Sequence, residues 1–158
     1  LMDEGLTSIR NLTNDLRPSH LDDLGLLPAL RSLAADMAER TGLALDLDVP
    51  DALPPVSAEA ELAVFRALQE SLSNVAQHAS ARRVAVTVRT AGGEVILEVR
   101  DDGRGLPDGG AWDGLERSGH LGLAGMRERI VAAGGALDIG NAAVGGARVV
   151  VRLPVTPE

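Results

Sequence analysis

The sequence predicts an α/β two-layer sandwich, in which a mixed, mostly antiparallel sheet of about five strands is covered by about three helices. The first observation behind this prediction is that segments with strand-like alternation come mostly as hairpin pairs, and not as strand–helix–strand units. The second is that 45% of the 158 residues are hydrophobic, which is enough for one domain with a core and an appended element.

The composition restricts the possible functions. The formal net charge is −8, which disfavours nucleic acid as the main partner, because phosphate backbones bind clustered positive charge. Cysteine is absent, so disulfides and thiolate metal sites are excluded. Lysine is absent too, which excludes the P-loop motif. No apolar run approaches the roughly 20 residues of a membrane-spanning helix. We therefore expect a cytoplasmic domain without membrane contact of its own, and any membrane anchor of the full-length protein would lie outside this chain.

The first half of the chain predicts three helices and one strand. The first helix ends before Pro18, because the residue before a proline disfavours the helical region. Gly42 ends the second helix, and Ser57 is a favourable N-cap for the third. The predicted elements are a helix over 3–16, a helix over about 26–40, a half-buried strand over 44–49 and a helix from Ser57 to Ala79.

The second half predicts two hairpins, separated by a long loop and a helix. Ala91-Gly92-Gly93 joins the first pair of strands, and a second glycine-rich turn joins the last pair. Residues 102–120 show no regular pattern, and loops of this length are often functional. The predicted elements are strands over 83–90 and 94–101, a helix over about 121–133 that ends at Gly134-Gly135, and strands over 136–140 and 147–155.

Three polar residues recur at every fourth position of the helix over 61–79: Glu70, Asn74 and His78. At this spacing they share a helix face that is distinct from the apolar stripe. One interpretation is a solvated polar face. The other is a metal and water site, because amide and carboxylate oxygens suit Mg²⁺.

Two glycine-containing segments have a similar double interpretation. Asp101 ends a strand and is followed by Gly103 and Gly105. An ionised carboxylate only accepts hydrogen bonds, so it suits an exocyclic amine such as that of adenine, and the glycines allow a flat base to approach the backbone. The alternative is ordinary Asp-Gly turn chemistry. Gly119 and Gly122 precede an amphipathic helix, whose N-terminus is either a phosphate site or a simple glycine-containing cap.

In this order and spacing, the segments E-x-x-x-N, D-x-G-x-G and G-x-x-G-L resemble the Bergerat ATP-binding fold over about residues 26–155. Within that superfamily, LRPSHLDDLGLLPAL (16–30) and GHLGLAGMRERI (119–130) resemble the sensor histidine kinases that signal to helix-turn-helix response regulators. The resemblance implies that residues 1–25 are the end of a second dimerisation helix and a linker. Residues 26–158 would then be the ATP-binding catalytic domain.

The resemblance implies ATP and Mg²⁺ as cofactors and assigns roles to individual residues. Asn74 and Glu70 would bind the metal, and Glu70 would also be the general base or water-orienting residue. Asp101 would bind the adenine amine. The other implied nucleotide-binding residues are His78, Gly103, Gly105, Leu106, Gly119, His120, Leu121, Gly122 and Leu123, with residues 106–120 as a lid over ATP.

The chain departs from the family pattern in three places. Gln77 stands where the family usually has a lysine or arginine, and Ala147 stands where a threonine often contacts adenine through water. Neither His20 nor His120 matches the phosphoacceptor histidine. The implied partners are therefore the dimerisation and phosphoacceptor domain of the same kinase and a response regulator, and we expect the full-length protein to be a homodimer.

Two alternatives remain at this stage. A serine kinase of the anti-sigma-factor type shares the ATP fold but lacks a dimerisation helix like the one that residues 1–30 resemble. A non-catalytic interaction module with a decayed ATP site is compatible with Gln77 and Ala147. The presence of Glu70, Asn74 and Asp101 argues against the decayed site.

Overall fold

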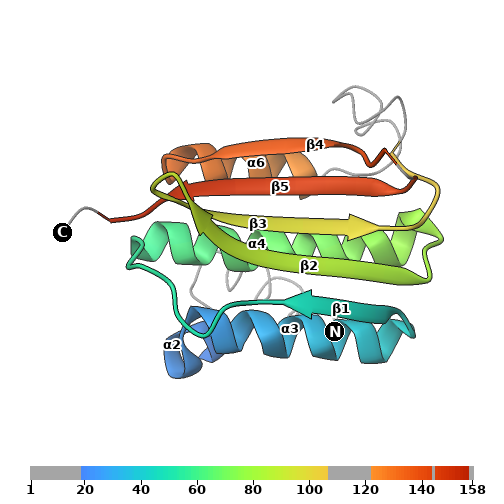
Figure 1. The fold of residues 1–158 in the computed structure, drawn as a ribbon, viewed down its shortest axis with the longest axis horizontal. Helices are drawn as coiled ribbons and strands as arrows, with labels where there is room; N and C mark the ends of the chain where they lie inside the picture. Colours follow the sequence, from blue (N-terminus) through green and yellow to red (C-terminus); the bar gives the residue numbers. More distant parts are fainter. Residues whose placement is uncertain (1–18, 107–121, 144, 157–158) are drawn as a thin grey trace, which may run out of the picture.

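A single five-stranded sheet organises the chain (Figure 1). The computed structural model describes residues 19–106, 122–143 and 145–156. The strand order is β1-β2-β3-β5-β4; β1 pairs parallel with β2, and every other pair is antiparallel. The strands are β1 (Ala44–Asp48), β2 (Arg83–Ala91), β3 (Glu94–Asp101), β4 (Ala136–Asn141) and β5 (Ala147–Pro154). The predicted mixed, mostly antiparallel sheet is confirmed.

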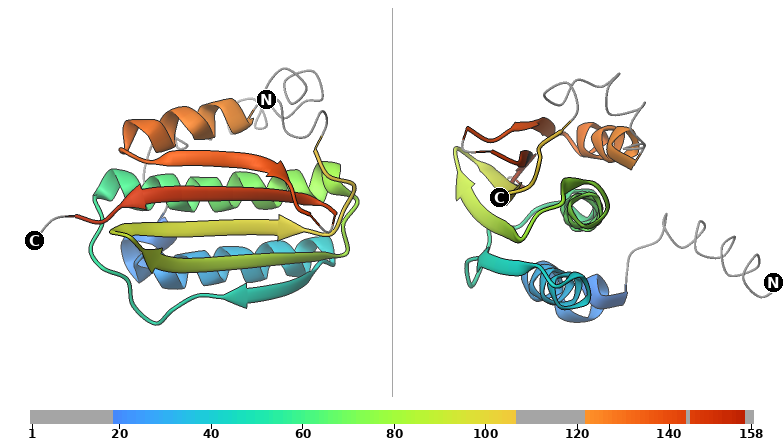
Figure 2. Two further views of the ribbon diagram at one scale, coloured as in Figure 1. Left: turned by 45° about the horizontal axis from the view of Figure 1, so that its top comes forward. Right: turned by 90° about the vertical axis from the view of Figure 1, so that its right-hand side faces the viewer.

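The long helices of the described residues cover one face of this sheet (Figure 2). Helix α4 lies in the middle, with α3 on the β1 side and α6 on the β4 side. The short α2 precedes α3, and the π-helix η1 continues α4. The helices are α2 (Ser19–Leu24), α3 (Leu26–Thr41), α4 (Ala58–Asn74), η1 (Val75–Ala79) and α6 (Gly122–Ala132). The predicted two-layer sandwich is therefore confirmed as well.

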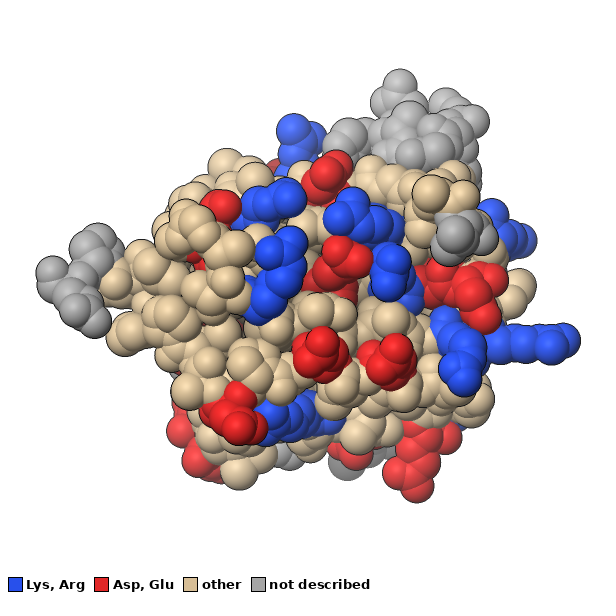
Figure 3. All heavy atoms as spheres, in the orientation of Figure 1, with Lys and Arg blue, Asp and Glu red and all other residues tan. Residues whose placement is uncertain are grey.

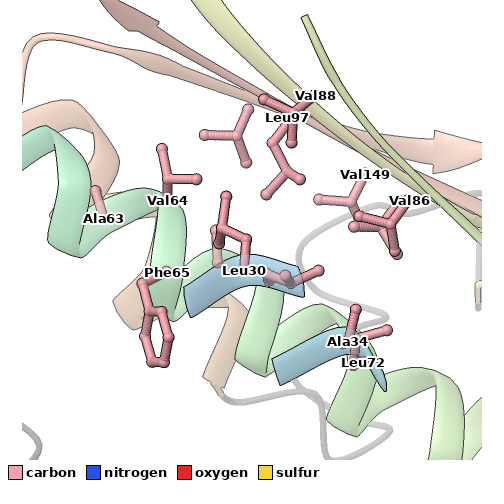
Figure 4. Packing of buried hydrophobic residues seen from close by; sticks show 14 of the residues in the cluster. Leu30, Ala34, Ala63, Val64, Phe65, Leu72, Val86, Val88, Leu97 and Val149 are labelled. Atoms are coloured by element: carbon pink, nitrogen blue, oxygen red, sulfur yellow. The ribbon is translucent and has the colours of Figure 1, made fainter. Parts of the chain in front are cut away.

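An aliphatic core fills the space between the two layers (Figure 4). Val86 and Leu97 point from the strands toward Leu30 of α3 and Val64 of α4, and all four are at most 1% exposed. Burial of each such side chain contributes about 1.5–3 kcal/mol to folding. Alternation along the strands places these residues on the helix-covered face, so the core follows from the sequence period.

Several predicted element ends are confirmed by their local geometry. The Ser57 hydroxyl accepts a hydrogen bond from the Ala60 N–H at 3.0 Å and caps α4. Gly42 ends α3 in the left-handed region, at φ 76°. Gly92 and Gly93 form the tight turn of the first hairpin, with φ of 60° and 75°.

Two parts of the predicted secondary structure differ. The single α-helix expected from Ser57 to Ala79 is wrong in its last turn, because the chain changes to a π-helix at Val75. π-Helical segments are rare in proteins overall, but where they occur they are often at functional sites. The sequence pattern of this helix does not predict the change. The expected linker also contains α2, and its Leu21 is only 2% exposed and belongs to the core. The helix predicted over 3–16 lies outside the described residues.

The other face of the sheet carries basic and acidic side chains in alternation (Figure 3). Glu98 lies between two arginines, at 3.2 Å from Arg148 and 3.1 Å from Arg100. Mixed signs of this kind do not form the positive patch that nucleic acid requires. In the described part of the chain, no helix has both the length and the apolar character needed to cross a membrane.

Candidate functional site

A pocket lies where α4 and η1 meet the sheet, next to the end of β3 and the start of β5. Its described walls are mostly apolar, and its polar side chains are Ser71, Asn74 and Asp101. Apolar walls with a few convergent polar groups are typical of small-molecule sites. The pocket is lined by Ser71, Asn74, Val75, Val99, Asp101, Gly105, Leu106, Leu123, Ala147 and Val149.

Asp101 is the buried carboxylate of this pocket, with 7% of its surface exposed. Its Oδ1 accepts hydrogen bonds from the backbone N–H groups of Gly103, at 2.8 Å, and Ala147, at 3.4 Å. Desolvation by burial raises the pKa of Asp101, and these two hydrogen bonds offset part of that effect. Both bonds use Oδ1. Among the described residues, Oδ2 receives no hydrogen bond, so it is available to a donor on a ligand.

Asp102, the next residue, binds the backbone at the start of β2. Its Oδ1 accepts from the backbone N–H groups of Arg82, at 2.8 Å, and Arg83, at 3.0 Å. These hydrogen bonds lower the pKa of this exposed carboxyl, and the bond from Arg83 has the larger effect. Asp102 therefore anchors the start of β2, and Asp101 alone of the two faces the pocket.

The first residues after β3 are held by a contact that sequence reasoning missed. The Leu106 N–H donates to Oδ1 of Asn141, at 2.7 Å, from the end of β4. Gly105 has a φ of 83°, and a Cβ there would lie 2.8 Å from the same oxygen. Because this contact joins residues 35 positions apart, no local signal could have identified Asn141.

Glu70 and Asn74 line different hollows. Asn74 lines the pocket of Asp101, whereas Glu70 lines a neighbouring groove between α4 and α6. The Glu70 carboxylate packs against Gly122, the first residue of α6, where a Cβ would fall onto its oxygens. The side chain of Glu70 thus reaches the N-terminus of α6, one helical turn from Asn74 on α4.

The donor chemistry of these two residues fits Mg²⁺, because both offer hard oxygens. The described residues contain no cluster of three or more histidine, cysteine or acidic side chains that could hold a metal. A metal at Asn74 and Glu70 would take its remaining ligands from water and from the phosphates of a nucleotide, as Mg²⁺ commonly does.

The remaining predicted site residues are placed only in part. Leu123 is 1% exposed and lines the pocket together with Gly105 and Leu106. Of His78, the structure describes only the backbone, within η1. Gly119, His120, Leu121 and most of the predicted lid lie outside the described residues.

Comparison with known proteins identifies the family. Residues 59–157 match the family described as histidine kinase-, DNA gyrase B- and HSP90-like ATPase. The chain belongs to this ATPase family. It is 39% identical over 140 residues to the sensor histidine kinase MctS of Rhizobium johnstonii, a match that covers 89% of this chain and 30% of MctS. It is 38% identical over 148 residues to the histidine-protein kinase/phosphatase UhpB of Salmonella typhimurium, with coverage of 93% and 28%.

Solved structures support the same assignment. The ATP binding domain of PrrB from Mycobacterium tuberculosis has a TM-score of 0.64 and 29% identity, and the match covers 83% of this ATPase chain and 94% of that one. A histidine kinase domain from Erythrobacter litoralis has a TM-score of 0.66 at 24% identity, covering 80% of this chain and 59% of that one, and shows the shared fold. The chain spans less than a third of the length of MctS and UhpB.

Proposed function

We propose that this chain is the ATP-binding catalytic domain of a sensor histidine kinase. It would present the γ-phosphate of ATP to a histidine on a dimerisation domain, for relay to a response regulator. The observation that carries the proposal is Asp101, a buried carboxylate with an available acceptor oxygen in a mostly apolar pocket of a chain from this ATPase family. The curated relatives named above are histidine kinases, which supports this class over a serine kinase.

The pocket would bind the adenine base. Asp101 would accept a hydrogen bond from the exocyclic amine, since an ionised carboxylate cannot donate one. Val99 and Val149 from the sheet and Leu123 from α6 supply apolar surface for the faces of the ring. Gly105 also lines the pocket, and its missing side chain leaves room for Asn141, which holds Leu106 in place.

The phosphates would lie toward the α4–α6 side of the site. Asn74 and Glu70 would hold Mg²⁺, which when bound neutralises charge on the transferred phosphoryl group. Glu70 would also orient the attacking group. The N-terminus of α6 at Gly122 favours negative charge through the helix dipole.

The receiving histidine would belong to the dimerisation domain of the same kinase, which would be a cytoplasmic homodimer through that domain. A second candidate function, a non-catalytic module with a weakened ATP site, has one observation in its favour. Gln77 is neutral where the family usually has a cation, and its Nε2 donates to the Ser73 hydroxyl at 3.1 Å. Nucleotide binding distinguishes the two candidates.

The test is calorimetric titration of the chain with ADP and ATP, with and without Mg²⁺. Asp101→Asn should weaken binding about 10–100-fold, because a hydrogen bond to a charged group is lost. Asn74→Ala should keep binding without Mg²⁺ and lose the gain that Mg²⁺ gives. Asp102→Asn is the matched control and should bind like the wild type. Absence of binding by the wild type would favour the non-catalytic module.

A further inference from the structure

Ser71 is a buried hydroxyl that finds no partner among the described residues. It lies on α4, is 2% exposed, and lines the same pocket as Asp101. Its Oγ makes no hydrogen bond within the described residues. A serine inside a helix commonly bonds to the carbonyl four residues earlier, and an unpaired buried hydroxyl destabilises the fold. The Oγ of Ser71 is therefore open to a hydrogen bond with a molecule in the pocket, either a water or a ligand.

Among the described residues that line the pocket, only Ser71 and Asn74 have a side chain that can donate a hydrogen bond, and the proposed function assigns Asn74 to the metal. Asp101, as a carboxylate, can only accept hydrogen bonds. Ala147 lines the same pocket and has no polar side-chain atom. The edge of adenine offers an amine donor beside a ring-nitrogen acceptor, so a carboxylate alone satisfies only half of it. Ser71 is a hydroxyl and can donate to the other half.

We propose that Ser71 is a further adenine-binding residue: its hydroxyl donates to the ring nitrogen beside the amine, directly or through one water, while Asp101 accepts from the amine. This inference rests on the proposed ATP-binding function. Guanine presents the opposite order at that edge, an oxygen acceptor beside a ring N–H. Asp101 therefore disfavours guanine, because its carboxylate would face that oxygen, whereas the Ser71 hydroxyl can donate or accept and so adds affinity for adenine without excluding guanine.

The first test compares ADP with 1-deaza-ADP, an analogue in which carbon replaces that ring nitrogen. The wild type should bind ADP about 3–10-fold more tightly than the analogue, the effect of one neutral hydrogen bond. Ser71→Ala should bind the two ligands equally, and should bind ADP as weakly as the wild type binds the analogue. The measurement is calorimetric titration of the 158-residue chain.

A second readout separates this role from a structural one. Without nucleotide, Ser71→Ala should raise the melting temperature by about 2–4 °C, because it removes an unpaired buried hydroxyl. A residue that only supported the fold would lower it. Ser32→Ala is the matched control, since Ser32 lies on α3 and does not line the pocket. It should bind ADP and the analogue like the wild type.

The outcomes distinguish this inference from the function on which it rests. If Ser71→Ala binds ADP as tightly as the wild type while Asp101→Asn loses binding, the role of Ser71 is refuted and the ATP site stands. If the wild type binds no ADP, or binds it no better than Asp101→Asn does, both proposals fail.

Discussion

Two adjacent carboxylates at the end of β3 show how strongly local environment decides what a residue does. Asp101 is buried in the pocket, and desolvation raises its pKa. Asp102 is exposed, and backbone hydrogen bonds lower its pKa. The buried charge of Asp101 lowers the stability of the fold but leaves an oxygen that can accept a hydrogen bond from a ligand. Asp102 stabilises the start of β2. The two should therefore respond oppositely to the same substitution.

We predict that Asp101→Asn stabilises the nucleotide-free chain at pH 7. The native pKa of Asp101 lies above the unfolded value of 3.8, so ionisation of this group in the native state opposes folding as the pH rises. The gain should shrink as the pH falls through the native pKa and should vanish below 3.8. Urea denaturation across this range measures it.

Asp102→Asn is the opposite case. Its native pKa lies below 3.8, so the carboxylate stabilises the fold above that pH and loses this effect as the pH falls through the native value. The substitution should destabilise the chain at pH 7 and become neutral in acid. Equal pH profiles for the two variants would contradict the assignment of Asp101 to the pocket and Asp102 to the β2 anchor.

At the scale of elements, the start of β5 builds one wall of the site through a glycine pair. Gly145 and Gly146 both adopt left-handed φ values, 106° and 82°. A Cβ at Gly145 would enter open space, whereas one at Gly146 would meet the backbone carbonyl of Asp101. Only glycine at position 146 allows β5 to lie this close to the carboxylate.

We predict that Gly146→Ala destabilises the chain more than Gly145→Ala. Each alanine costs about 1–2 kcal/mol for its left-handed backbone, and Gly146→Ala adds about 1–3 kcal/mol for the steric clash. Gly146→Ala should also weaken ADP binding, because Asp101 must shift. The measurements are urea denaturation and calorimetry. Equal losses of stability in the two variants would show that β5 does not pack against Asp101 as described.

How much of this could be predicted from the sequence depends on the distance over which each signal acts. The cap at Ser57 and the Gly92-Gly93 hairpin follow from neighbouring residues and were predicted. The π-turn of η1 was not, since no local pattern distinguishes it from an α-helical turn. Asn141 was missed because its partner is 35 residues away. For the candidate site, the motifs predict Asp101 and Asn74, and the fold places both in one pocket with Ser71, which no motif singles out.

At the scale of the whole molecule, the site exists only in the folded chain. Ser71 comes from α4, Asp101 from the end of β3 and Ala147 from the start of β5, so helix layer and sheet must pack before the pocket forms. The candidate site residues of the described chain lie in two neighbouring hollows beside α4, one against the sheet and one against α6. Under the proposed function, the acceptor histidine belongs to another domain.

We predict that the chain alone binds ATP and forms no stable phosphohistidine. Its sequence holds three histidines. His20 is in α2 and His78 is in η1. The resemblance to sensor histidine kinases implies a phosphoacceptor on the first dimerisation helix, and neither His20 nor His120 matches it. The measurement is incubation with γ-labelled ATP and Mg²⁺, followed by a search for label that is stable in alkali and lost in acid. The expected result is none, from a sample in which calorimetry shows bound ADP. If the wild type carries such label, and replacing one histidine by glutamine removes it, the acceptor lies in this chain. The proposal that the acceptor belongs to another domain would then be refuted.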